Sequence, residues 1–73
     1  MANNTEVTYE IIEHIGELGK RGDWTREVNI VAWNGGVPKV DIREWSPNHK
    51  RMARGITLME AEAEKLAELL SAR

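Results

Sequence analysis

Two of the three tryptophans in this 73-residue chain lie at the ends of one short segment, WNGGVPKVDIREW, which runs from Trp33 to Trp45. Between them stand two cations, Lys39 and Arg43. An indole offers a flat π surface on which an unstacked base can lie, and lysine or arginine neutralises a phosphate. The combination is typical of surfaces that bind single-stranded nucleic acid, because every base has a π face and every nucleotide carries a charge.

The same residues also have ordinary structural interpretations. Tryptophan in a small protein usually belongs to the core, and paired charges in a loop usually contact only solvent. Exposed tryptophan and arginine are also favoured at the hot spots of protein interfaces. A protein-interaction module therefore remains an alternative, and so does single-stranded RNA binding, since no residue is identified as a reader of the 2′-hydroxyl.

Alternation of side chains predicts how this segment is positioned. Residues 24–33 and 39–45 alternate with a period of two, and Asn34, Gly35 and Gly36 supply a tight turn, so we expect a hairpin of two strands. Pairing these strands gathers the apolar side chains on one face, the predicted core: Val28, Ile30, Ala32, Val40 and Ile42. The opposite face then carries the candidate site: Trp33, Lys39, Arg43 and Trp45.

The flanking sequence predicts the remaining elements. A first strand begins at Val7 and runs on through Ile15, with a bend or bulge at Gly16, until a loop over residues 19–23 ends it. A short strand over residues 55–58 precedes an amphipathic helix that should cover the core face and be capped by Thr57 with Glu60. We expect an α+β domain over residues 7–73, with four antiparallel strands followed by one C-terminal helix, after a disordered segment 1–6.

Charge and length limit the class of protein. Net charge is −2, yet residues 20–54 hold eight cations against four anions. The chain shows no signal peptide and no run of about 18 apolar residues, so we expect no membrane contact and a cytoplasmic location. It has no cysteine and no histidine–cysteine cluster, so neither a disulfide nor a metal or cofactor site is expected. A core this small usually needs help, which favours a homodimer.

The segment EVNIVAWNGGVPKVDIREW, followed by a basic loop and by RMARGITL before the terminal helix, resembles the positive-cofactor-four family of single-stranded-DNA-binding transcriptional coactivators, particularly its bacterial YdbC-like branch. The similarity covers about Trp24 to Leu70. It implies a two-fold homodimer of curved antiparallel sheets, in which single strands follow grooves lined by aromatic and basic side chains. Carried onto this chain, it points to the following residues: Trp33, Lys39, Arg43, Trp45 and Arg54.

Further contributors to this candidate nucleic-acid site follow from residue type. Lys50 and Arg51 would extend the cationic track, and Arg26 has a minor role toward phosphate. Asn29 and Asn34 can donate hydrogen bonds to bases or phosphates. Asp41 would repel phosphate unless it pairs with Lys39 or Arg43, so we expect it to orient one of them.

No activated nucleophile and no nucleotide-hydrolysis motif occurs in the sequence, so we do not expect an enzyme. The expected function is sequence-independent binding of single-stranded DNA by a dimer. Such binding would support transcription regulation, repair or replication, with transcription or repair proteins as further partners.

Overall fold

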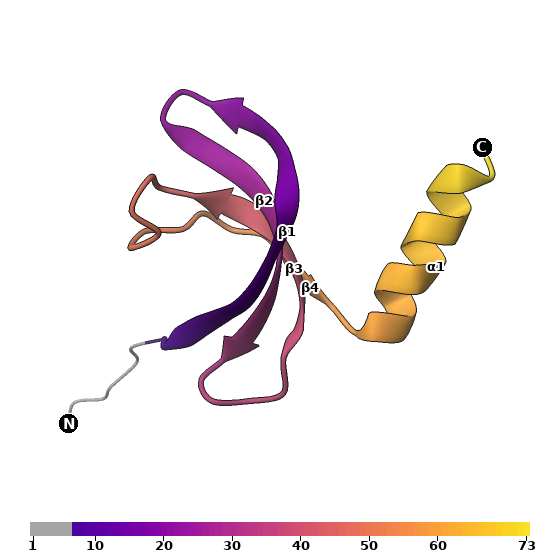
Figure 1. Cartoon of the computed structure of the whole chain (residues 1–73), viewed down its shortest axis with the longest axis horizontal. Helices are drawn as coiled ribbons and strands as arrows, with labels where there is room; N and C mark the ends of the chain where they lie inside the picture. The colour runs from indigo at the N-terminus through magenta and orange to yellow at the C-terminus, as the bar shows by residue number, and fades with distance from the viewer. Residues whose placement is uncertain (1–6) are drawn as a thin grey trace.

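The structure is a computed structural model that describes residues 7–73, so the expected disorder of residues 1–6 lies outside the described residues. Its elements are β1 (Tyr9–Arg21), β2 (Trp24–Trp33), β3 (Lys39–Trp45), β4 (Ile56–Leu58) and α1 (Glu60–Ser71), shown in Figure 1. The strands form one antiparallel sheet in the order β1-β2-β3-β4. The predicted α+β fold, four antiparallel strands followed by a C-terminal helix, is confirmed.

β1 is longer than predicted. It continues through Gly16 and Gly19 to Arg21, so the expected loop over residues 19–23 shrinks to a tight turn in which Gly22 has a φ of +63°. Its pairing with β2 shifts register three times, at Ile12, Ile15 and Leu18, each of which lacks a partner in β2. A bulge adds a residue to one strand and increases its twist, so β1 bends strongly across the sheet, as Figure 1 shows.

The bulges also change which residues of β1 share a face. With an extra residue at every third position, one side of the strand recurs with a period of three. Ile11, His14 and Glu17 therefore lie on the same side and line one cavity with Glu27 of β2. The apolar residues Ile12, Ile15 and Leu18 are about half exposed or more.

The hairpin register places the predicted partners together, but the predicted core face is not the buried one. Val28 pairs with Ile42 and Ile30 with Val40, and all four are only partly buried. We call this side of β2 and β3 the outer face. The most deeply buried side chains lie on the other side, the inner face: Glu27, Asn29, Val31, Asp41 and Trp45. The curvature of the sheet causes this difference, because β1 and the loop after β3 close over the inner face.

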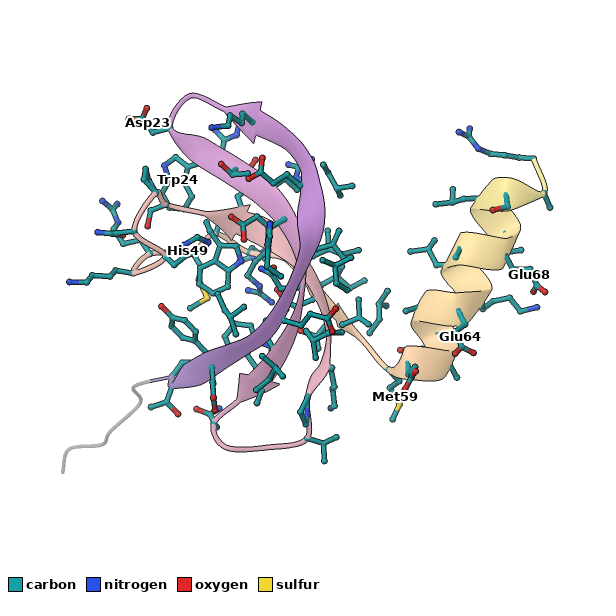
Figure 2. All side chains as sticks on the ribbon, in the orientation of Figure 1. Asp23, Trp24, His49, Met59, Glu64 and Glu68 are labelled. Carbon is teal, nitrogen blue, oxygen red and sulfur yellow. The ribbon has the colours of Figure 1, made fainter. Side chains whose placement is uncertain are left out.

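The helix does not cover the sheet either. α1 touches only β3 and β4, none of its residues is buried, and Figure 2 shows its side chains standing apart from those of the sheet. Three of its leucines, Leu66, Leu69 and Leu70, are 38–59% exposed. The prediction that α1 packs on the core face of its own chain is therefore wrong for this chain taken alone.

The start of α1 also differs from the predicted capping box. The N-cap residue is Met59, whose backbone N–H donates a hydrogen bond of 2.9 Å to the carboxylate of Glu62. Thr57 is not the cap, because its hydroxyl donates to Asp41 of β3 at 2.9 Å. Within residues 7–73, no helix is long and apolar enough to span a membrane.

Candidate nucleic-acid interface

An aromatic cluster occupies the inner face. Ring centroids lie 5.9 Å apart for Tyr9 and Trp33, 5.1 Å for Tyr9 and Trp45, and 5.5 Å for Trp45 and His49, all in tilted arrangements. Trp45 is completely buried beneath Tyr9 of β1 and His49 of the β3–β4 loop, whereas Trp33 is partly exposed. Of the two tryptophans proposed for base stacking, only Trp33 presents accessible surface, and Trp45 forms the floor of the cluster.

Arg43 is fixed over the indole of Trp33. Its guanidinium carbon lies 4.7 Å from the Trp33 ring centroid. Asp41 accepts two hydrogen bonds from this guanidinium, at 2.6 and 2.8 Å, and the Ala53 carbonyl accepts a third at 3.3 Å. Asp41 is completely buried and also accepts the Thr57 hydroxyl. The expected pairing of Asp41 with one of the two cations is thus confirmed for Arg43.

This geometry changes the chemistry that Arg43 can supply. A guanidinium has five N–H donors, and here two of its nitrogens are held by the Asp41 carboxylate and the third by Ala53. Its charge is balanced by a buried carboxylate, so a phosphate gains less from it than from a free arginine. Arg43 is instead a rigid, flat cation next to an indole, an arrangement suited to stacking.

The backbone of Gly55 packs very closely against Ile42 and Arg43 of β3. A Cβ built on Gly55 would lie 2.3 Å from the Arg43 Cβ and 2.3 Å from the Ile42 carbonyl oxygen. No other residue can approach β3 so closely without moving it. The segment that leads into β4 therefore packs directly on Arg43, and it also supplies the Ala53 carbonyl and the Thr57 hydroxyl described above.

Trp33 and Arg43 line an open cavity of about 450 Å³. Its other walls come from Val7, Asn34, Met52 and Thr57. Small-molecule sites are typically cavities of about 300–1,000 Å³ with mainly apolar walls and a few polar groups, and this cavity falls in that range. The aromatic cluster, Arg43 and this cavity together form what we call the inner-face groove.

The other predicted cations do not line the cavity beside Trp33 and Arg43. Lys39, Lys50, Arg51 and Arg54 are exposed, and the guanidinium of Arg51 lies 5.8 Å from the Trp24 ring centroid. Arg26 lies on the outer face, opposite to Arg43, because it pairs with Glu44 across the hairpin. A nucleic-acid strand that followed the inner-face groove would therefore not contact Arg26.

An ion cluster surrounds Glu44 on this outer face. Its carboxylate accepts hydrogen bonds from Arg21 at 2.6 and 3.2 Å and from Arg26 at 3.0 Å. The hydrogen bonds from Arg21, followed by the charges of both arginines, lower the pKa of the Glu44 carboxyl, although burial partly opposes them. The same contact raises the pKa of Arg21. The cluster holds the β1–β2 turn region onto β3.

The two predicted asparagines are engaged within the chain. Asn29 is completely buried, donates to the Glu27 carboxylate at 3.0 Å and contacts His14 Nδ1 at 2.7 Å through its oxygen. Asn34 sits in the hairpin turn with a φ of +52°, and its side-chain oxygen accepts the backbone N–H of Thr8 at 3.0 Å. These contacts leave neither amide oxygen available for reading bases.

Sequence reasoning did not single out Tyr9, His14 or Glu27. These residues reach the inner face through contacts with sequence separations of 13 to 40 residues, such as the hydrogen bond from the Tyr9 hydroxyl to the His49 carbonyl. Local alternation carries no information about such contacts. In the structure, the bulged period of three in β1 places Ile11 and His14 on the same side.

A strongly curved four-stranded antiparallel sheet with one C-terminal helix, and with a groove of aromatic side chains and a fixed cation on its inner face, defines a class of small groove-bearing ββββα proteins. The chain belongs to the family described as transcriptional coactivator p15 (PC4), which it matches over residues 20–69. It is also 39% identical over 69 residues to an uncharacterized protein of Treponema pallidum (strain Nichols), which covers 93% of this chain and 81% of that protein.

The family match contains most of the groove. It includes all of β2, β3 and β4, and with them Trp33, Asp41, Arg43 and Gly55. Tyr9 and His14 of β1 lie before it. The resemblance inferred from DIREW and GITL is confirmed at the level of the family.

Proposed function

We propose that this protein binds single-stranded DNA in the inner-face groove, with a base stacked at Trp33 and Arg43. The observation that carries the proposal is a partly exposed indole with a guanidinium fixed 4.7 Å away, beside an open cavity of about 450 Å³. Membership of a transcriptional coactivator family supports a role on nucleic acid. The protein then acts by binding alone, without catalysing a reaction.

Base stacking and phosphate neutralisation would come from different residues of the groove. Stacking on an aromatic side chain contributes about 1–3 kcal/mol per base and tolerates any sequence. Since Asp41 balances Arg43, the phosphates are left to the exposed cations Lys50, Arg51 and Arg54. Each neutralised phosphate adds about −0.7 to the slope of log affinity against log salt for a single strand. Because stacking tolerates any base and the buried Asn29 amide is already engaged, we expect little base preference.

The proposal includes a homodimer. The outer face and α1 expose many large apolar side chains: Ile12, Ile15, Leu18, Ile56, Leu66, Leu69 and Leu70. So many exposed large apolar side chains on a small protein indicate an interface. A second copy of the chain would cover it and leave both inner-face grooves open. Such a dimer would serve transcription regulation, repair or replication in the cytoplasm.

A binding titration tests the proposal. We expect oligo-dT carrying a rhodamine label to bind with a strong salt dependence, and Trp33→Ala to weaken binding by about 1–3 kcal/mol. Trp24→Ala is the matched comparison, because Trp24 lies at the far end of β2 and contacts only Arg51 among the proposed binding residues, so it should cost less than Trp33→Ala. Equal affinity of wild type and Trp33→Ala would reject the stacking site. Weak dependence on salt would instead favour a protein partner for the exposed tryptophan.

A further inference from the structure

A buried carboxylate on the inner face is shared by two histidines from other elements. Glu27 of β2 is only 4% exposed. His49, labelled in Figure 2 in the β3–β4 loop, contacts it with Nε2 at 2.9 Å. His14 of β1 places Nδ1 3.6 Å from the same carboxylate and 2.7 Å from the Asn29 oxygen, and the Asn29 amide donates to Glu27 at 3.0 Å. We call these four residues the histidine–glutamate cluster.

The hydrogen-bond pattern locates the protons. A carboxylate only accepts, so His49 carries a hydrogen on Nε2. The Asn29 amide nitrogen donates to Glu27, so the Asn29 oxygen accepts from His14 Nδ1. Within residues 7–73, the second nitrogen of each ring has no hydrogen-bond partner, and the histidine side chains are 50% and 40% exposed. Each imidazole can therefore take up a proton from solvent without breaking a bond that it already makes.

The surroundings of the cluster are otherwise poor in free cations. From β1, Glu17 pairs with Glu27 across the strands, and Lys20 lines the adjacent cavity together with Asp23 of the turn. From β3, Arg43 is the register partner of Glu27, but its guanidinium is held by Asp41. With both imidazoles neutral, this end of the groove holds three carboxylates near Lys20, and the exposed cations Lys50 and Arg51 follow His49 in its loop. The carboxylates therefore oppose these cations in holding an anionic strand here.

Protonation changes this end of the groove in two ways. It adds two positive charges beside the path proposed for the strand, and it turns the contact between His49 and Glu27 into a charge-assisted hydrogen bond, which is stronger. His49 has a φ of +59°, donates its backbone N–H to the Ser46 carbonyl at 2.9 Å, and accepts the Tyr9 hydroxyl at its own carbonyl. Holding His49 more firmly thus also holds the loop that carries Lys50 and Arg51.

We infer that His14 and His49 make the affinity of the inner-face groove for single-stranded DNA depend on pH, with tighter binding as the pH falls from about 8 to about 5.5, the range in which imidazoles change charge. The inference rests on the proposed function and describes regulation of the same site. Because the protonated form binds the anion better, binding takes up protons. The slope of log affinity against pH is therefore negative and has a magnitude of at most about 2, one proton for each histidine.

The experiment measures the affinity for rhodamine-labelled oligo-dT at constant ionic strength across this pH range. Thymine and the rhodamine label do not titrate here, so a change in affinity reports the protein. For the wild type we expect binding about tenfold or more tighter at the acid end. The double variant His14→Gln with His49→Gln, which removes both histidines of the chain, should lose most of this dependence, whatever affinity it retains near pH 8.

A second measurement uses only the wild type, so it does not depend on whether the double variant folds. In the wild type, the NMR signals of the two imidazole rings should titrate at higher pH with oligo-dT bound than without it, as proton uptake requires. Tight binding that is equal at every pH, or imidazole titrations that ignore the ligand, would overturn this inference and leave the proposed function intact. Failure to bind at any pH would overturn the proposed function itself.

Discussion

Arg43 shows that an arginine in the proposed nucleic-acid groove can be placed for stacking instead of for phosphate binding. A cation between two tryptophans suggests a phosphate contact, yet the buried carboxylate of Asp41 holds Arg43 in place at 2.6 and 2.8 Å. Fixing the guanidinium over Trp33 removes the entropy that a mobile arginine would lose on binding. The groove gains a preorganised stacking surface and gives up a free charge.

Asp41 should therefore be required for folding as well as for the site. Asp41→Ala leaves Arg43, whose side chain is 14% exposed, without its partner, and breaking a buried ion pair from one side costs about 3–5 kcal/mol. Urea denaturation followed by circular dichroism measures the loss. Glu68→Ala, which breaks the exposed pair with Lys65, is the control and should change stability by less than about 0.5 kcal/mol. Equal midpoints for Asp41→Ala and wild type would contradict this account of Arg43.

Residue-level reasoning from sequence was strongest where local alternation decides the outcome. Once the hairpin register is set, the alternation of side chains along paired strands places Trp33 and Arg43 on the same face. The burial of Trp45 could not be predicted, since the side chains that cover it, Tyr9 and His49, come from distant parts of the chain. The histidine–glutamate cluster was missed for the same reason.

At the scale of elements, the hairpin was predictable and β1 was not. The bounds predicted for β2 and β3 are the observed ones, because both strands alternate regularly and a glycine-rich turn separates them. β1 contains three bulges, which replace the period of two by a period of three and let the strand run through Gly16 and Gly19. The sequence predicted a bend or bulge at Gly16, but it predicted the end of the strand at Gly19, because a polar, glycine-rich cluster is typical of a loop.

The segment before β4 is an element whose position depends on one glycine. Gly55→Ala should destabilise the chain by about 1–3 kcal/mol and displace Arg43, because the new methyl group would lie 2.3 Å from Arg43 and from the Ile42 carbonyl. Gly16→Ala is the matched control, since no atom outside its chain neighbours lies within 4 Å of its added Cβ. Urea midpoints and oligo-dT affinity measure both effects. A Gly55→Ala variant as stable and active as Gly16→Ala would show that this close approach is unimportant.

At the scale of the whole molecule, the chain is more open than its length requires. Its radius of gyration is 13.6 Å, whereas a compact chain of this length has about 11 Å. The amphipathic pattern of α1 was recognised in the sequence, but it does not say which surface the helix meets. In this chain alone, none of the described residues of α1 is buried, and Figure 2 shows the helix standing apart from the sheet. The second copy of the chain proposed above would remove this mismatch between pattern and burial.

The proposed dimer makes a prediction about exposed leucines. Leu69 is 59% exposed in the single chain, so Leu69→Lys would cost little in a monomer. In a dimer it should bury a charge in the interface and convert the protein to a monomer of lower, concentration-independent melting temperature. Analytical ultracentrifugation and thermal unfolding at two concentrations test this. Val37→Lys, at an exposed position beside the hairpin turn, is the control, and a wild-type monomer at high concentration would refute the dimer.

The central claim is that a single strand of DNA lies in the inner-face groove against Trp33. An NMR titration of isotope-labelled protein with oligo-dT follows all three tryptophan indole signals and the backbone amides together. We expect the largest shifts at Trp33, Arg43 and the neighbouring loop, with the outer face and α1 little changed. Shifts concentrated on the outer face or on α1, with the Trp33 signals unmoved at saturation, would contradict it.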